Sequence, residues 1–312
     1  MSTEPGKAVR VNRRYHPDDP RLAHGAPAQR PDWLKVKTPV GEHYHELKKL
    51  VSDKCLHTVC ESARCPNIGE CWQSRTATFL ILGNTCTRGC AFCAVTSGQP
   101  TEYDLDEPRR VAEAVATLNL RYAVVTSVTR DDLADGGAYI FAETIRQIRA
   151  LTPDCRVEVL IPDFQGDDAA LATVIEAQPD VLNHNVETVE RLYTLVRPQA
   201  DYRRSLDLLA HARKIDPATV TKSGIMLGLG ETEEEIEQTL RDIHAAGCSI
   251  VTIGQYLRPS TGHLPVQKYY APEDYVRFAE LGKAIGFQHV ESAPLVRSSY
   301  HAREQADEGI AV

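Results

Sequence analysis

The chain has 312 residues, of which 42% are hydrophobic and 25% are charged, and its formal net charge is −8. This length allows one or two domains and a core that needs no disulfides. The acidic balance argues against a general nucleic-acid binder, and no apolar stretch is long enough to span a bilayer. No apolar signal-peptide core opens the chain, so we expect a cytoplasmic protein with neither a membrane nor nucleic acid as partner.

Residues 1–37 differ from the rest of the chain. They hold five prolines, eight Lys or Arg and four Asp or Glu, without a sustained helical or strand period. This composition predicts an extended or disordered arm. Two interpretations stay open, a solvated tail and a wrapping segment that docks on the body or on an acidic partner.

Seven of the nine cysteines lie within residues 55–93. In a chain without an export signal, such clustering favours metal ligation over disulfides. The upstream set is Cys60, Cys65 and Cys71, and a proline and a glycine between them break any continuous helix. These three thiolates can converge on one metal centre whose fourth position stays open or is filled from elsewhere. Cys55 is a further thiol close to this set.

The downstream set is Cys86, Cys90 and Cys93, on one short loop after the first expected strand. Thiolates are soft ligands that suit iron–sulfur clusters or zinc. A closed zinc site needs a fourth Cys or His nearby, and none follows soon after Cys93. Three cysteines on a 4Fe–4S cube leave one iron free to bind substrate or cofactor. A structural zinc loop completed from elsewhere is the alternative.

From about residue 76 onward, short β-rich runs alternate with longer amphipathic stretches. We expect strands at 76–82, 122–127, 156–161, 180–185, 221–226 and 249–255, and helices near 108–119, 138–151, 167–177, 201–215, 232–246 and 273–285. The alternation predicts βαβ units and a parallel sheet in an α/β fold. Six units are two short of a complete barrel, so we expect a partial (β/α)6 barrel of the TIM type. Functional residues should then lie after the carboxyl ends of the strands.

The downstream cysteine loop, with Phe92 directly before Cys93, resembles the radical S-adenosylmethionine (SAM) superfamily. The resemblance implies that the free iron binds the amino and carboxylate groups of SAM. An electron from the cluster then releases a 5′-deoxyadenosyl radical. With the upstream set in front of this loop, the chain resembles the lipoyl synthase family. That resemblance also covers residues 56–60, 126–133, 183–188 and 297–302.

Membership of this family implies the insertion of two sulfur atoms, at C6 and C8, into an octanoyl chain on a lysine of a carrier domain. Cys60, Cys65 and Cys71 would hold an auxiliary 4Fe–4S cluster that donates the sulfur. The resemblance places its fourth ligand at Ser299, with Ser298 as the alternative. A serine alkoxide is a harder and more easily displaced iron ligand than a thiolate. Together with the downstream cysteines, Ser299 is therefore a predicted catalytic residue.

The same resemblance implies the partners and the domain organisation. The partners would be octanoylated carrier domains of 2-oxoacid dehydrogenases, the glycine-cleavage H protein, a flavodoxin or ferredoxin as electron donor, and an iron–sulfur carrier that rebuilds the cluster. We expect an arm at 1–37, an auxiliary-cluster segment at 38–75, the radical SAM barrel at 76–291 and a closing segment at 292–312.

Further polar residues follow the expected strands. Asn183, Asn185 and Glu187 could bind the ribose hydroxyls or amino group of SAM, and Arg197 its carboxylate, whereas internal hydrogen bonds and a surface ion pair are the alternatives. Phe92 is a further cofactor candidate. We leave residues 130–132 open between cofactor contact and helix capping, and the glycine-rich run 224–231 between adenine contact and a plain turn. His184, Cys155 and Cys248 are expected in the core.

Two other functions fit parts of this pattern. A two-cluster methylthiotransferase would also carry both cysteine sets, but it should have an extra nucleic-acid-binding domain. A non-enzymatic iron–sulfur or zinc protein would need the thiolates but not SAM. Iron content and reductive cleavage of SAM distinguish these alternatives.

Overall fold

The computed structural model describes residues 15–16, 18–22, 29–36, 41–73, 76–100 and 103–310. More than half of the predicted arm lies outside these residues, as do the last two residues of the predicted closing segment. No helix in the described part of the chain is long and apolar enough to cross a membrane.

An eight-stranded sheet forms the centre of the molecule, in the order β1-β2-β5-β6-β7-β8-β9-β10. Its strands are β1 (His57–Thr58), β2 (Thr78–Ile81), β5 (Tyr122–Ser127), β6 (Arg156–Leu160), β7 (Val181–Asn183), β8 (Val220–Leu227), β9 (Ile250–Gln255) and β10 (His289–Ser292). All neighbouring pairs are parallel except β1 with β2. The six predicted strands are all present, and the partial parallel barrel is confirmed.

Two strands of this sheet were not predicted from the sequence. β10 continues the sheet beyond β9, with His289 aligned to Ile250. β1 pairs antiparallel with β2 through only two residues. Both are short, and β10 alternates polar residues with a single buried valine, so neither has the apolar pattern that marks a strand in sequence.

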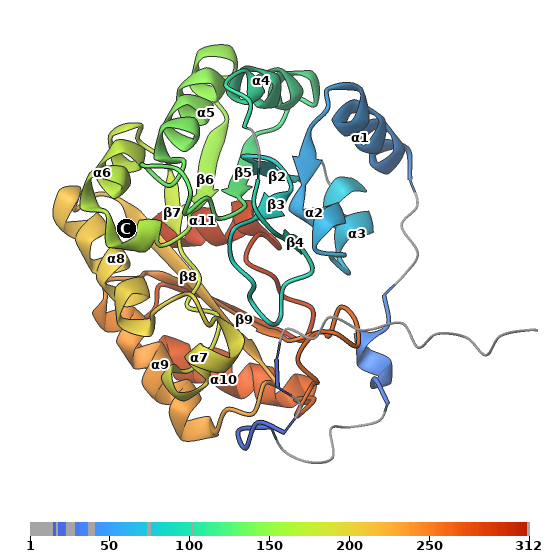
Figure 1. Cartoon of the computed structure of the whole chain (residues 1–312), viewed down its shortest axis with the longest axis vertical. Helices are drawn as coiled ribbons and strands as arrows, with labels where there is room; N and C mark the ends of the chain where they lie inside the picture. The colour runs from blue at the N-terminus through green and yellow to red at the C-terminus, as the bar shows by residue number, and fades with distance from the viewer. Residues whose placement is uncertain are drawn as a thin grey trace, which may run out of the picture.

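Helices follow the parallel strands and form an arc around the outside of the sheet (Figure 1). They are α4 (Glu107–Thr117), α5 (Ala138–Leu151), α6 (Asp168–Glu176), α8 (Tyr202–Ile215), α9 (Glu233–Ala245) and α10 (Pro272–Ile285). Each lies within two residues of a helix predicted from the amphipathic period. The ends are set by local signals, such as the Thr232 capping box that begins α9 and Gly286 at φ 121° after α10.

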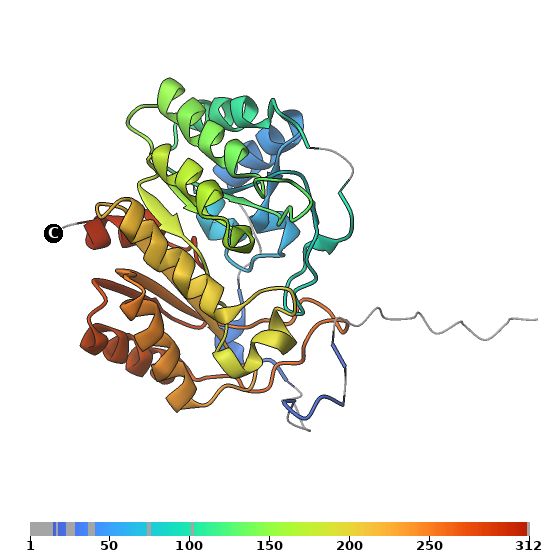
Figure 2. The ribbon, with the colours of Figure 1, turned by 60° about the vertical axis from the view of Figure 1, so that its left-hand side comes forward.

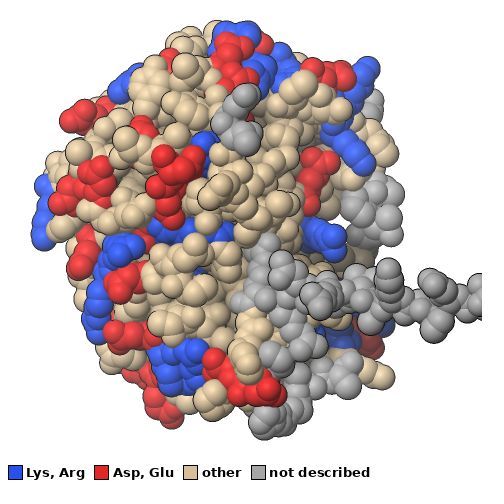
Figure 3. Space-filling model, in the orientation of Figure 1, with Lys and Arg blue, Asp and Glu red and all other residues tan. Residues whose placement is uncertain are grey.

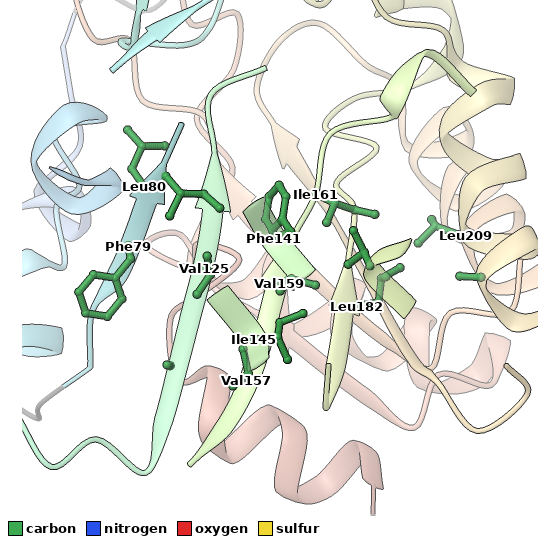
Figure 4. Close-up of a cluster of buried hydrophobic side chains, with 14 of the residues drawn as sticks. Phe79, Leu80, Val125, Phe141, Ile145, Val157, Val159, Ile161, Leu182 and Leu209 are labelled. Carbon is green, nitrogen blue, oxygen red and sulfur yellow. The ribbon is translucent and has the colours of Figure 1, made fainter. Parts of the chain in front are cut away.

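Successive side chains along each strand point alternately to the outer core, beneath the helices, and to the barrel interior. Val125, Val157, Val159 and Leu182 point outward and pack with the helices (Figure 4). Burial of each such side chain contributes about 1.5–3 kcal/mol. The intervening residues, Tyr122, Val124, Glu158, Leu160 and Asn183, face the interior. A period of two along each strand therefore determines which residues can reach a site inside the barrel.

The amino-terminal part of the chain packs beside β2. It contains α1 (Glu42–Asp53), α2 (Val59–Ser62) and α3 (Ile68–Gln73). After β2, a small sheet of β3 (Thr85–Cys86) and β4 (Thr96–Ser97) flanks the downstream cysteine loop. Trp72 of α3 is fully buried, with its ring 5.2 Å from that of Tyr44. Leu22 and Leu34, the latter in the 3-10 helix Asp32–Leu34, are also buried. The described pieces of the arm therefore pack on the body.

The C-terminal segment does two different things. After β10, residues 293–301 run across the barrel, and the chain then ends in α11 (Ala302–Ile310). Ala302 and Ala306 of α11 pack against Tyr122 and Val181, at the amino ends of the strands. Figure 2 shows α11 beside the strands, away from the loops that follow their carboxyl ends. Only the first part of the predicted closing segment is therefore near the expected site.

Candidate functional site

A cavity of about 580 Å³ lies inside the barrel and opens among the loops that follow the strands. We call it the barrel cavity. It is lined by the upstream loop (Val59, Cys60, Ala63, Arg64, Cys65, Pro66, Ile68), the downstream loop (Phe92, Cys93, Ala94), strand residues (Thr78, Val124, Leu160, Asn183, Gly224, Ile225, Met226, Thr252, Gly254), Asn185, Glu187, residues 256–259 and 296–299, Arg30 and Val36. Members of both cysteine sets and both candidate serines therefore face one space.

The upstream cysteines lie on two short helices joined by a tight loop. The Thr58 side chain caps α2, which carries Cys60, and the backbone N–H of Cys65 donates to the Cys60 carbonyl at 3.0 Å. Cys71 follows on α3. Burial raises the pKa of Cys60 to about 11, and the nearby Cys65 thiolate raises it further. Burial, then repulsion by Cys60 and Cys65, also raises the pKa of Cys71. None of the three forms a disulfide, and their mutual effects on pKa show that they lie close together.

The C-terminal segment packs directly on this upstream loop. Asn67 donates from Nδ2 to the Leu295 carbonyl at 2.7 Å, and the Tyr300 hydroxyl donates to Glu70 at 3.1 Å. Burial raises the pKa of Cys65, whereas the positive charge of Arg297 lowers it. These contacts join residues about 230 positions apart and bring the segment with both serines to the upstream cysteines.

The two serines differ in their surroundings. Ser298 donates from Oγ to Oδ1 of Asn185 at 2.8 Å, so it is part of the cavity wall formed after β7. Ser299 also lines the cavity and directly precedes Tyr300, which contacts Glu70 next to Cys71. This difference favours Ser299 over Ser298 as the residue available to the upstream cysteines.

The downstream loop is fixed by backbone and ion-pair contacts. Cys86 accepts N–H bonds on Sγ from Arg88 at 3.4 Å and Thr129 at 3.3 Å, as expected of a thiolate ligand. The buried Arg88 guanidinium donates twice to Asp131, at 2.7 and 2.8 Å, and once to Asp163 at 2.6 Å. These carboxylates raise the pKa of Arg88 despite its burial. The loop conformation therefore depends on residues after β5 and β6.

The end of the downstream loop reaches the cavity. Phe92 and Cys93 line it, whereas Cys86 and Cys90 are not among its lining residues. The Cys93 carbonyl lies 2.9 Å from Nε2 of His263, in the loop after β9. Burial raises the pKa of Cys90, and the Cys86 thiolate also raises it, so these two thiols lie close together.

The predicted cofactor residues are gathered after β7. Asn183, Asn185 and Glu187 all line the cavity. Asn185 donates from Nδ2 to Glu187 at 3.2 Å, and burial raises the pKa of Glu187. Oδ1 of Asn183 is buried and has no hydrogen-bond partner among the described residues. An unpaired buried acceptor in a cavity wall is suited to a donor group on a ligand.

Arg197 does not line the cavity, although it supports its wall. Its Nη1 donates to the Asn185 carbonyl at 2.9 Å and to the Tyr193 hydroxyl at 2.7 Å. The buried Nε has no hydrogen-bond partner in the part of the chain that the structure describes. Arg197 forms none of the ion pairs between described residues, so a surface ion pair does not explain it.

Other sequence candidates have structural explanations. Arg130 pairs with Asp132 at 2.8 Å and Asp131 with Arg88, so this run binds neighbouring loops and caps no helix. His184 is buried between the Ile161 carbonyl and Ser205 Oγ, and burial lowers its pKa to about 4. In the glycine-rich run, the Glu231 carboxylate accepts the N–H groups of Gly228 and Leu229. Residues 224–226 of the same run line the cavity, so the run's contact with adenine stays a prediction. Cys155 and Cys248 are buried.

One internal polar group was missed by the sequence analysis. Lys222 Nζ lies 3.0 and 3.2 Å from the Glu158 carboxylate oxygens, and both side chains are fully buried. Tyr122 and Asn183 also donate to Glu158, at 2.8 and 2.9 Å. The group fills the barrel interior beneath Asn183. The only signal in sequence was a single charged residue inside each of two apolar strands.

The cysteine geometry can be tested against the two metal chemistries. Across the residues that the structure describes, no three His, Cys, Asp or Glu side chains are placed to hold a single metal ion. A 4Fe–4S cube separates its ligating sulfurs more widely than one zinc ion does. Two sets of three cysteines, none of them in a disulfide, therefore fit clusters better than closed zinc sites.

Comparison with known proteins identifies the family. The model of the Radical SAM superfamily matches residues 80–243, and the model of the N-terminal domain of lipoyl synthase matches residues 9–65. A lipoyl synthase from Rubrobacter xylanophilus is 60% identical over 279 residues, which cover 89% of this chain and 87% of that protein. The chain belongs to the lipoyl synthase family. The family resemblance predicted from the cysteine motifs is thereby confirmed.

Further relatives agree with this membership. A lipoyl synthase from Koribacter versatilis is 60% identical over 281 residues, covering 90% of this chain and 92% of that protein. Among solved structures, methylornithine synthase aligns with a TM-score of 0.50 and 13% identity, covering 83% of each chain. The hydrogenase maturase HydG aligns with a TM-score of 0.51 and 15% identity, covering 88% of this chain and 68% of that one. These structures support the barrel fold. Superfamily membership implies one 4Fe–4S cluster and SAM.

Proposed function

We propose that this chain makes the lipoyl group by inserting sulfur at C6 and C8 of an octanoyl chain on a carrier-domain lysine, using two 4Fe–4S clusters. One observation carries the proposal. Two separate three-cysteine loops and a C-terminal serine segment meet at a single cavity inside a radical SAM barrel. A radical generated at one side of such a cavity is close to a sulfur source at the other.

We assign Cys86, Cys90 and Cys93 to the cluster that cleaves SAM. The auxiliary cluster, which donates sulfur, would be held by Cys60, Cys65, Cys71 and Ser299. When bound, the clusters supply the electron that cleaves SAM to a 5′-deoxyadenosyl radical and the sulfur that is inserted. The chain itself would fix the geometry. The N–H bonds to Cys86 Sγ and the Arg88 ion pairs hold the first loop. Contacts of Asn67 and Glu70 with the C-terminal segment hold the second.

SAM would bind along the wall after β7. Asn183 offers an unpaired acceptor, Asn185 and Glu187 lie beside it, and Phe92 faces the same cavity from the cysteine loop. Arg197 has a buried, unpaired Nε that could receive a carboxylate, although its position behind the wall makes support of Asn185 its better-founded role. The remaining apolar lining, such as Val124, Leu160 and Ile225, suits an octanoyl chain.

The substrate would be an octanoylated carrier domain, such as those of 2-oxoacid dehydrogenases or the glycine-cleavage H protein. Turnover also requires an electron donor such as flavodoxin or ferredoxin. If the auxiliary cluster is consumed, an iron–sulfur carrier must rebuild it. These three classes of partner complete the proposal.

The test separates the two cysteine sets in anaerobically reconstituted enzyme. Two filled clusters give about eight irons per chain. Replacement of Cys86, Cys90 or Cys93 by Ala should abolish 5′-deoxyadenosine formation. Replacement of Cys60, Cys65 or Cys71 by Ala should leave some SAM cleavage but no lipoyl product. Lipoyl formation by an upstream variant would refute the assignment of the sulfur source.

The serine assignment has a matched control in its neighbour. Ser299→Ala should retain SAM cleavage and lose lipoyl product. Ser298→Ala removes one hydrogen bond to Asn185 and should retain part of the activity. Ser299→Cys should keep full iron content yet release little sulfur, because a fourth thiolate binds iron more firmly. A stronger loss from Ser298→Ala than from Ser299→Ala would reverse the assignment.

A further inference from the structure

The charged residues around the barrel cavity are unequally distributed. Its lining includes four arginines, Arg30, Arg64, Arg258 and Arg297, but a single carboxylate, Glu187. Arg30, Arg64 and Arg258 are exposed, whereas Glu187 lies deeper, next to Asn185. We call these three exposed arginines the arginine rim. Its members come from the amino-terminal segment, the upstream cysteine loop and the loop after β9, which meet only in the folded chain.

The arginine rim has no compensating carboxylates among the described residues. Arg258 donates to the carbonyls of Thr261 and His263 and to the Tyr15 hydroxyl, and Arg30 donates to the Leu34 carbonyl. These acceptors are uncharged. Exposed arginines elsewhere, such as Arg109, Arg241 and Arg277, pair with carboxylates on the same helix.

This positive region contrasts with the rest of the molecule. The chain carries a net charge of −8. Acidic and basic side chains are interspersed around the margin of the face in Figure 3, as expected of a solvated surface. An anionic partner would therefore be repelled by the molecule as a whole and attracted at the cavity mouth. Such an arrangement selects the orientation of approach and speeds association.

We propose that the arginine rim docks an acidic surface of the carrier domain around its octanoylated lysine. The inference rests on the proposed function, because an octanoyl-lysine arm can enter the cavity only if the surface beside that lysine faces the rim. Guanidinium groups suit this role, since each can bind a carboxylate through two parallel hydrogen bonds. The alternative is that the rim binds the carboxylate of a small ligand inside the cavity.

The experiment compares two substrates with reconstituted full-length enzyme. One is an octanoylated carrier domain of a 2-oxoacid dehydrogenase, and the other is an octanoyl-lysine peptide without charged neighbours. Arg64→Glu and Arg30→Glu should each lower kcat/KM for the domain by roughly three- to tenfold at low salt. The loss should shrink at high salt because charge interactions are screened. Turnover of the peptide should fall far less.

Arg121→Glu is the matched control. Arg121 is exposed, precedes β5 at the opposite end of the barrel, and forms no ion pair with a described carboxylate. It undergoes the same change in charge and should leave both substrates unaffected. Iron content, measured for every variant, establishes that cluster loading is equal. A carrier domain whose carboxylates beside the lysine are changed to lysines should regain activity with Arg64→Glu.

The outcomes are distinct. Equal losses on domain and peptide would overturn the proposal and assign the rim to a ligand inside the cavity. No loss on the domain, or an equal loss with Arg121→Glu, would also overturn it. Failure of the unmodified enzyme to convert either the carrier domain or the peptide would refute the proposed function, independently of docking.

Discussion

Removal of the lysine from the buried Glu158–Lys222 pair provides a sharp test of the fold. Lys222→Met keeps most of the side-chain volume but leaves the Glu158 carboxylate without its cation. Both residues are fully buried, so solvent cannot compensate. Burial lowers the pKa of Lys222, and the adjacent carboxylate opposes that change. The substitution should therefore destabilise the folded chain.

The magnitude follows from the remaining contacts. Breaking a buried ion pair costs about 3–5 kcal/mol. Tyr122 and Asn183 still donate to Glu158 at 2.8 and 2.9 Å, so we expect the lower end, about 3 kcal/mol. For a chain of this size, that corresponds to a fall in melting temperature of roughly 5–10 °C.

The assay is denaturation followed by far-UV circular dichroism under anaerobic conditions. The double variant Lys222→Met/Glu158→Gln removes both charges and should recover most of the loss. Arg241→Met breaks an exposed pair with Glu237 on α9 and should barely shift the midpoint. A Lys222→Met protein as stable as the parent, or a double variant as unstable as the single one, would refute the reasoning.

Three further predictions concern other parts of the structure. Burial lowers the pKa of His184 to about 4. The neutral, buried imidazole therefore stabilises the folded state fully above about pH 6.5, and this stabilisation is lost as the pH falls towards 4. Denaturant titrations should show that this residue costs about 2 kcal/mol of the free energy of unfolding by about pH 5. His184→Gln should reduce the slope of the free energy of unfolding against pH. Arg88→Ala should lower 5′-deoxyadenosine formation about 10–100-fold, and Arg88→Lys should rescue it only partly because Lys cannot reproduce the paired contacts with Asp131. Gly224→Ala would place a Cβ 2.4 Å from Thr252 Oγ1 and should destabilise the protein by about 1–3 kcal/mol in thermal denaturation. An unchanged pH dependence of stability in His184→Gln would contradict the first prediction. Full SAM cleavage by Arg88→Ala would contradict the second, and an unchanged melting temperature of Gly224→Ala the third.

The sequence was most informative where the signal is local. Apolar alternation and amphipathic period predicted strands such as Tyr122–Ser127 and Ile250–Gln255 within one residue, because these patterns reflect burial on one or both faces of an element. The spacing of Cys86, Cys90 and Cys93 predicted a cluster loop, and their place after β2 followed from the same pattern.

The sequence was least informative for short or polar elements. β10 has four residues with only Val290 buried, and α11 gave no recognised period. The burial of Glu158 and Lys222 also could not be predicted, since a charge in a strand is ordinarily exposed and is tolerated inside only when its partner is present.

What the sequence determined by itself is the six main strands and helices, their order and the family, because propensity, period and ligand spacing all act over a few residues. Tertiary structure decided which distant residues share a site. It joined Asn67 to Leu295 and Tyr300 to Glu70, placed Ser298 on Asn185, and put Ser299 in the wall of the cavity that Cys60 and Cys65 also line. Each such contact is weak and spans more than 100 residues, so its loop-closure entropy is offset only once the whole barrel has folded.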